Sequence, residues 1–344
     1  FQQPLADLIN LKHPLVKLAE LIDWSVFETR WAEFFPSRTG RPASSPRLIA
    51  GLLYLQHTFA CSDEDLIWTW VENPYWQHFC GETYFQHEPP IDPSSMTRWR
   101  QRIGEEGVEW LLTETIEAAR RGKVVKSKSF EKIIIDTTVM EKAVAYPTDS
   151  RLLERGRQHL VKLAGALGIT LRQNYNREAP RLAVQVGRYV HAKQYRRMKA
   201  TLKSLRTIVG RVWRDIDRKL DHQNEAQSAK AGSILARVKR LLEQKPKDKN
   251  KLYSLHAPEV ECISKGKARQ PYEFGVKVTV AITHKEGLVV GMRSLPGNPY
   301  DGHTLPEAIE QVSILTAQKP KAVFVDKGYR GVSVDGVTIW RSGQ

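Results

Sequence analysis

Two short apolar runs, each ending in an aspartate, constrain the fold of this chain more than any other feature. Residues 132–136 place three isoleucines before Asp136, and residues 322–326 place Ala-Val-Phe-Val before Asp326. Short runs rich in β-branched and aromatic residues are typical of buried strands. A carboxylate directly after such a strand lies at the rim of a sheet, where ligands and metals usually bind. The two runs therefore predict a sheet with an acidic edge.

Further patterns surround these runs. The sequence favours strands over 272–283, 287–294 and 337–340, with a helix over 303–318 before the second aspartate. Between Asp136 and the later strands, spaced Leu, Ile and Val residues predict helices from about 151 to 245. We therefore expect an α/β fold in the C-terminal part, with a long helical insertion between its strands.

The insertion carries the excess positive charge of the chain. The formal net charge is +15, from 53 Lys and Arg against 38 Asp and Glu. Residues 151–250 hold 25 Lys and Arg against 8 Asp and Glu, a net of +17, which leaves 28 against 30, or −2, for the rest. These basic residues either form solvated helix faces or bind a polyanion by displacing its counterions. Both interpretations stay open at this point.

The N-terminal part, residues 14–122, is expected to be a run of short helices. Ser45-Pro46 and Ser62 are start signals, and Asn73-Pro74 is a break. Ser94 or Ser95 is then expected to cap a short helix. Five tryptophans in this region are expected to be core residues rather than base-stacking platforms: Trp68, Trp70, Trp76, Trp99 and Trp110.

The short helix after Ser95 is a candidate DNA reader. Arg98, Gln101 and Arg102 are side-chain types that reach base edges or phosphates when a helix enters the major groove. The alternative is an amphipathic helix with Trp99 and Ile103 in the core and its arginines in water. The sequence leaves both alternatives open.

Composition excludes several other classes. Three widely spaced cysteines argue against a disulfide framework and favour a reducing, cytoplasmic setting. The sequence lacks an apolar run of about 18 residues, so we expect no membrane span. It also lacks the P-loop pattern, so ATP-driven chemistry has no support. His57, Cys61, His78 and Cys80 suggest zinc, but they include no C-x-x-C pair, which favours core packing.

Asp136 and Asp326 are the candidate metal ligands. If their strands are neighbours, the two carboxylates form a hard oxygen site suited to Mg²⁺ or Mn²⁺. Two such ions, about 3.5–4 Å apart, can support in-line phosphoryl transfer. The alternative is that each aspartate only caps the turn that follows its strand.

Four segments, taken in order, resemble the transposases of bacterial insertion sequences that use the DDE set of carboxylates. They are residues 136–153, 272–277, 296–305 and 325–329. The helical region over 15–110 is similar to the domain that precedes the catalytic core in that family. The resemblance covers most of the chain, and four matches in one order are more specific than any one of them.

The resemblance implies a fold and a division into domains. The fold is α/β, with an RNase H-like mixed sheet interrupted by a long basic helical insertion and preceded by an all-α domain. Residues 1–125 would form the helical N-terminal transposase domain, with DNA binding as its role. Residues 130–344 would form the catalytic domain, with the insertion at 151–250.

It also implies an activity and the residues that carry it. Asp136 and Asp326 would hold divalent metal during strand cleavage at the element's ends and strand transfer to target DNA. Two copies would act as a homodimer on double-stranded DNA, in association with the nucleoid. Asp301 matches a recurring position beside the site without being a metal ligand. Lys327 and Tyr329 either touch phosphate near the metal, or Tyr329 packs under the sheet.

The family's third carboxylate, a glutamate on a helix downstream of the second aspartate, has no counterpart in this sequence. Residues 327–344 contain no Glu, and Asp335 is their only acidic residue. The chain also begins with Phe1, which suggests a fragment. We therefore expect an incomplete, inactive or nearly inactive catalytic domain. The alternatives are a DNA-binding remnant that represses element ends and a general RNase H-like nuclease.

Overall fold

The computed structural model describes residues 3–34, 44–220, 225–249, 251–264 and 271–343. They form two compact units. The first comprises residues 1–136, 279–293 and 301–344, and the second comprises residues 137–278 and 294–300. Among the described residues, no helix is both long and apolar enough to cross a membrane.

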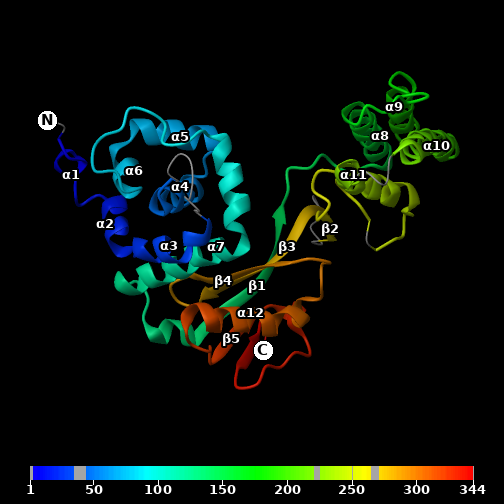
Figure 1. Ribbon diagram of the computed structural model, residues 1–344. Helices are drawn as coiled ribbons and strands as arrows, with labels where there is room; N and C mark the ends of the chain where they lie inside the picture. Colours follow the sequence, from blue (N-terminus) through cyan, green and yellow to red (C-terminus); the bar gives the residue numbers. More distant parts are fainter. Residues whose placement is uncertain (1–2, 35–43, 221–224, 250, 265–270, 344) are drawn as a thin grey trace. The chain divides into compact units, whose positions relative to one another are not determined.

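The first unit begins with short helices whose ends follow the predicted signals (Figure 1). Ser62 caps α5 by accepting the N–H of Asp65 at 3.1 Å. Asn73 ends α5 and caps α6 by accepting the N–H groups of Tyr75 and Trp76. The helices of this region are α1 Leu5–Leu8, α2 Pro14–Leu21, α3 Trp24–Arg30, α4 Pro46–Phe59, α5 Asp63–Glu72, α6 Pro74–Phe79 and α7 Ser94–Arg121.

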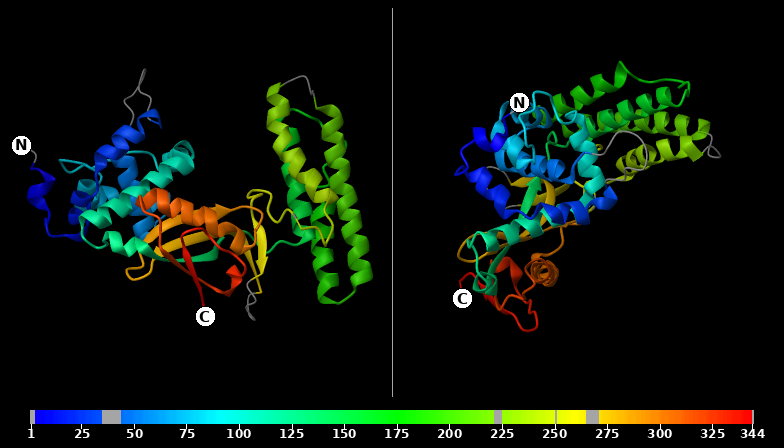
Figure 2. Two further views of the ribbon diagram at one scale, coloured as in Figure 1. Left: turned by 90° about the horizontal axis from the view of Figure 1, so that it is seen from below. Right: turned by 60° about the vertical axis from the view of Figure 1, so that its left-hand side comes forward.

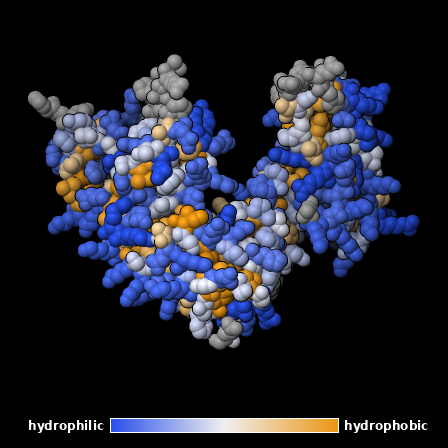
Figure 3. Space-filling model, turned by 60° about the horizontal axis from the view of Figure 1, so that its bottom comes forward, coloured by the Kyte–Doolittle hydropathy of each residue, from blue (hydrophilic) through white to orange (hydrophobic). Residues whose placement is uncertain are grey.

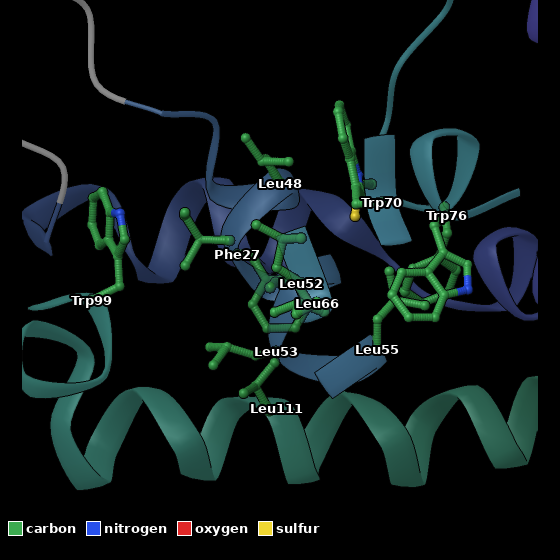
Figure 4. Close-up of a cluster of buried hydrophobic side chains, with 14 of the residues drawn as sticks. Phe27, Leu48, Leu52, Leu53, Leu55, Leu66, Trp70, Trp76, Trp99 and Leu111 are labelled. Carbon is green, nitrogen blue, oxygen red and sulfur yellow. The ribbon is translucent and has the colours of Figure 1, made fainter. Parts of the chain in front are cut away.

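The helical core is built around α4, with α7 packed along one side (Figure 4). Leu52 and Leu66 are fully buried in it, together with Phe27 of α3. Trp70, Trp76 and Trp99 are buried and Trp110 packs against the cluster, as expected for core tryptophans. Trp68 does not follow this expectation, because its side chain lies on the solvent face of α5 and is 57% exposed.

Helix α7 begins differently from the expectation, and it consists of two helical segments that meet at a kink. The expected short helix with Arg98, Gln101 and Arg102 ends at Gly104, whose φ of 62° and ψ of −160° are not helical, and a second segment continues to Arg121. The N-cap position is Pro93, and neither Ser94 nor Ser95 caps the helix. Asp92 takes that role instead, since its Oδ1 accepts the N–H of Ser94 at 2.9 Å. The capping signal thus lies before the prolyl residue rather than after it.

The sheet is mixed and has the order β2-β3-β1-β5-β6, with β4 also paired to β3. β1 pairs with β5 and β5 with β6 in parallel, whereas β2 pairs with β3 antiparallel. β3 runs antiparallel to β1, because Lys142 donates to the Phe274 carbonyl and His284 donates to the Lys132 carbonyl. This is the RNase H-like mixed sheet that the resemblance implies. The strands are β1 Lys132–Glu141, β2 Glu261–Ser264, β3 Tyr272–Thr283, β4 Val289–Leu295, β5 Ala322–Val325 and β6 Thr338–Arg341.

Two details of this region differ from the expectation. β2 was not predicted, because four residues with two polar ends give too short a pattern to recognise. Helix α12 spans Asp301–Thr316 and so begins two residues earlier than expected. Its apolar side, with Leu305, Ile309 and Val312, packs in one cluster with residues of β1 and β5.

The second unit contains the helical insertion (Figure 2). Its helices, over the described residues, run side by side around an apolar core that includes Leu160, Leu205 and Leu235. A buried ion pair joins Glu154 and Arg157, with Arg157 also donating to the carbonyl of Asn174 at 2.8 Å. The helices are α8 Asp149–Ala166, α9 Glu178–His191, α10 Tyr195–Lys219 and α11 Glu225–Glu243.

Candidate functional site

The register between β1 and β5 places the two predicted aspartates side by side. The pairs are Lys132↔Ala322, Ile133↔Val323 and Ile134↔Phe324. Continuing that register by two residues sets Asp136 beside Asp326. Neighbouring strands lie about 4.8 Å apart, so residues 190 positions apart in the sequence become adjacent at one edge of the sheet.

Both aspartates belong to the same face of the sheet. Side chains alternate between faces along a strand. Ile133 and Ile135 of β1 are buried on the core side, as are Val323 and Val325 of β5. Asp136 and Asp326 fall on the opposite side and are exposed. The strands therefore present two carboxylates to solvent while their apolar partners anchor the edge.

The turn after β5 brings a third carboxylate to the same place. Asp326 caps the short helix η3 Lys327–Tyr329 by accepting the N–H of Gly328 at 2.8 Å. A Cβ built on Gly328 would lie 2.9 Å from Asp326 Oδ1 and 3.3 Å from Asp301 Oδ2. The carboxylate of Asp301, the first residue of α12, therefore lies at the turn that holds Asp326. A side chain at position 328 would therefore displace the Asp326 carboxylate and crowd that of Asp301.

These residues suit a hard divalent cation in their chemistry. Two solvent-facing carboxylates on adjacent strands supply the oxygen ligands that Mg²⁺ and Mn²⁺ prefer. The capping role weighed for Asp326 is also real, but it uses one hydrogen bond to Oδ1. Within the described ranges, no group of three or more His, Cys, Asp and Glu side chains is arranged to hold a metal ion. The described residues therefore offer two solvent-facing carboxylates on neighbouring strands, with Asp301 at the adjoining turn.

The two alternatives for Lys327 and Tyr329, contact with a phosphate or packing under the sheet, can be compared with the structure. Tyr329 is fully buried in the apolar cluster beneath the sheet, so its side chain packs rather than facing a ligand. Lys327 is exposed next to Asp326. Of these two side chains, Lys327 is therefore the one that is accessible from solvent.

The first segment of α7, which is the candidate DNA-binding helix, has its polar side chains exposed to solvent. Arg98, Gln101 and Arg102 are exposed, whereas Trp99 and Ile103 are buried as the amphipathic alternative requires. Arg102 also stacks over the Trp99 ring, with its guanidinium carbon 4.7 Å from the ring centroid. The same helix thus meets the packing requirement and offers three exposed polar side chains on one side.

The four His and Cys residues considered for zinc do not form a metal site among the described residues. Cys80 is buried against Gly51 of α4, where a built Cβ would meet its Sγ at 2.8 Å. Burial raises the pKa of the Cys80 thiol, and burial followed by the nearby Arg47 lowers the pKa of His78. Both effects favour neutral groups, and Cys80 packs in the core as expected, whereas His57 is exposed and does not follow the expectation of core packing.

The resemblance placed Asp301 beside the site, and its carboxylate does lie at the turn that holds Asp326. Sequence reasoning missed a group of basic residues on the surface of the insertion. Arg211, Arg214 and Arg218 lie on one side of α10 and line a hollow with Arg172. Their spacing of three and four residues was a readable signal, since such residues share a helix face.

Comparisons with known proteins give consistent matches. The transposase domain family DUF772 matches residues 3–102, and a transposase DDE domain family matches residues 239–334. An uncharacterized protein of Rhizobium meliloti, ORF8 in the nfe locus, is 48% identical over 195 residues. That match covers 57% of this chain and 94% of the relative. No solved structure matches the chain.

Proposed function

The chain belongs to the DDE transposases of bacterial insertion sequences, and from this we propose that Asp136 and Asp326 hold the divalent metal with which it cuts and joins DNA. The family implies DNA binding and an enzyme of the strand-cleaving and strand-transferring class. The observation that carries the proposal is the β1–β5 register, which sets the two carboxylates side by side on one face. The relative's printed name assigns it no activity.

In this proposal the protein residues hold the metal ion and the DNA phosphate in place, and the metal ion supplies the positive charge that the reaction needs. Asp136 and Asp326 would hold Mg²⁺ or Mn²⁺, which when bound stabilises the charge that develops on phosphate oxygens. Lys327, exposed beside Asp326, would bind a DNA phosphate next to the cut. Gly328 would keep the turn close enough for Asp326 and Asp301 to share the edge.

We further assign roles to the parts of the chain. Residues 1–125 would form the DNA-binding N-terminal domain, in which Arg98, Gln101 and Arg102 contact the inverted-repeat ends. Residues 130–344 would form the catalytic domain, with the basic insertion at 151–250. Two copies would hold two DNA ends as a homodimer, in the cytoplasm at the nucleoid.

The two aspartates alone would make a slow catalyst. The family resemblance implies a third carboxylate on a glutamate, and residues 327–344 contain no Glu. A metal ion held by fewer protein ligands is less firmly positioned for in-line attack. The rival function is DNA binding without catalysis, in which the chain occupies element ends and represses intact copies. The exposed polar side of the helix with Arg98 suits that function as well.

The decisive experiment uses the purified 344-residue chain and DNA that flanks its own coding sequence. We expect the chain to retain this DNA in a gel, and to nick it slowly at the element boundary only with Mg²⁺ or Mn²⁺. Asp136→Asn should retain binding and lose nicking.

Three outcomes would count against this account. Specific binding with no nicking at any metal concentration would favour the repressor. Equal cutting of unrelated DNA or RNA–DNA hybrids would favour a general nuclease. Rapid cutting would contradict the slow-catalyst proposal and direct attention to Glu141 or Asp335 as a further ligand.

A further inference from the structure

A basic hollow of about 470 Å³ lies on the helical insertion. Its residues are not close in the sequence to Asp136 or Asp326. It is lined by four arginines, Arg172, Arg211, Arg214 and Arg218, together with Tyr175 and Asp215. An adjoining hollow of about 630 Å³ shares Arg172 and contains Lys219, but most of its lining comes from residues 167–171, which include Leu167, Ile169 and Leu171. The surface of the bundle is mostly hydrophilic on the face seen at the right of Figure 3.

Helix geometry explains why the arginines gather here. Arg211, Arg214 and Arg218 are three and four residues apart on α10, and such residues project from the same side of a helix. Arg172 comes from the loop between α8 and α9 and reaches the same side. The loop between α8 and α9 and the helix α10 therefore both contribute arginines to one side of the hollow.

Asp215 fixes the loop to the helix. Its buried carboxylate accepts the backbone N–H of Arg172 at 2.8 Å, and Lys219 lies 3.1 Å from its other oxygen. Lys219 also donates to the carbonyl of Thr170 at 2.7 Å. The Arg172 N–H, followed by Lys219, lowers the pKa of Asp215, so the carboxylate stays ionised in its structural role.

The guanidinium groups themselves remain largely available for a ligand. Arg211 lies 3.5 Å from the hydroxyl of Tyr175, and Arg214 folds back over Gly210, where a built Cβ would meet it at 3.2 Å. Arg218 is 67% exposed and lies 4.0 Å from Asp215. In the described part of the chain, no carboxylate forms an ion pair with Arg211 or Arg214. Asp215, the carboxylate in the lining of the hollow, is already held by the Arg172 N–H and by Lys219, with Arg218 at 4.0 Å.

We propose that this arginine hollow, defined by Arg172, Arg211, Arg214 and Arg218, binds the phosphodiester backbone of DNA. The inference rests on the proposed transposase function and assigns its insertion a specific contact surface. From Arg211 to Arg218 the helix rises about 10 Å. That length matches about three phosphates of one strand, at roughly 3.4 Å of duplex axis each.

The lining chemistry favours a nucleic-acid backbone over other anions. Guanidinium groups bind phosphate oxygens in paired hydrogen bonds. Four such groups are more than a single phosphate needs, which favours a ligand with several phosphates in a row. The arginine hollow is lined by arginines, the amide of Gln173, the hydroxyl of Tyr175 and the carboxylate of Asp215, whereas the apolar side chains that a lipid surface would need belong to the adjoining hollow. Contacts of this kind position DNA without reading its sequence.

The test measures binding of the full chain to a fluorescent 30-base-pair duplex of unrelated sequence over a series of KCl concentrations. The variant is Arg211→Gln with Arg214→Gln. The matched control is Arg196→Gln with Arg197→Gln, which removes the same charge from exposed positions on the same helix. Loss of two phosphate contacts should reduce the slope of log K against log salt by about 1.8. The control should reduce it by clearly less.

The outcomes separate this inference from the proposed function. If the unaltered chain fails to bind duplex DNA, the proposed function itself fails. If the chain binds duplex DNA but the arginine-hollow variant and the control variant have the same salt slope, only the assignment of the arginine hollow is wrong. Titrations with inorganic phosphate and with phosphatidylserine vesicles identify other ligands. A variant that loses either of these while keeping its DNA slope would overturn the assignment. Thermal melting checks the fold, and Arg214→Gln alone replaces the pair if the pair unfolds.

Discussion

The carboxylates of this chain differ sharply in their surroundings. Asp63 receives two hydrogen bonds from Arg100, at 2.8 and 2.6 Å, and one from Gln56. Asp136 and Asp326 instead face solvent at the ends of strands. A carboxylate held by a cation stabilises the fold, whereas exposed and closely spaced carboxylates favour a cationic ligand.

The Asp63–Arg100 pair predicts a specific acid sensitivity. The Arg100 guanidinium lowers the pKa of Asp63 below its ordinary value. The pair's contribution is therefore complete above the unfolded pKa, about 3.9, and is lost as pH falls toward the folded pKa. Arg100→Gln should make the stability fall less steeply between about pH 5 and pH 3.

Urea denaturation at each pH, followed by tryptophan fluorescence, measures this slope. Arg102→Gln is the control, because its guanidinium contacts the Phe34 carbonyl and the Trp99 ring rather than a carboxylate. That variant should keep the slope of the unaltered chain. Parallel curves for Arg100→Gln and the unaltered chain would show that the pair has no part in acid unfolding.

At the scale of elements, Gly104 interrupts α7 with φ 62° and ψ −160°. That conformation is accessible to glycine and costs other residues about 1–3 kcal/mol. Gly104→Ala should therefore lower stability even though a Cβ there meets no atom within 4 Å. Gly187→Ala in α9, which also has open space around it, should raise stability by about 0.5–1 kcal/mol. Thermal melting of both variants shows whether stability falls in the first and rises in the second. A gain in stability for Gly104→Ala would mean that α7 straightens without cost.

The insertion depends on its buried ion pair. Arg157 is 3% exposed and holds Glu154 through two hydrogen bonds, at 3.0 and 2.7 Å. Arg157→Gln leaves a buried carboxylate without its cation, which should cost about 3–5 kcal/mol. Arg155→Gln, on the exposed side of α8, should change stability by less than about 0.5 kcal/mol. Trp213 reports on unfolding of this bundle, since it packs against the bundle core, and equal effects of the two substitutions would contradict the prediction.

Elements with strong local patterns were predictable, and features set by tertiary contact were not. The isoleucines before Asp136 and the periodic residues of 151–245 identified their strand and helices correctly. The short helix with Arg98 was expected, but the second segment of α7 from Gly104 to Arg121 had no predicted bounds. The approach of Asp301 to Asp326 was expected only from the family resemblance, because it depends on how α12 packs beside the turn at Gly328 and has no local pattern.

At the scale of the whole molecule, charge and chemistry are assigned to different stretches of sequence. Residues 151–250 hold a net charge of +17, and the remaining residues hold −2. In our account the basic insertion supplies affinity for phosphate, which acts at long range and depends on salt. The strand-end aspartates supply a local site for metal. The account requires that these aspartates act as one site.

Binding of Mn²⁺ to the full chain, counted by electron paramagnetic resonance, tests that requirement most directly. Asp136→Asn and Asp326→Asn should each weaken binding by about tenfold or more, and the double variant should lose little beyond either single one. Asp335→Asn, in the turn between Val334 and Val337, should leave binding unchanged. Unaltered binding in the single variants, or losses that multiply in the double variant, would contradict a shared metal site.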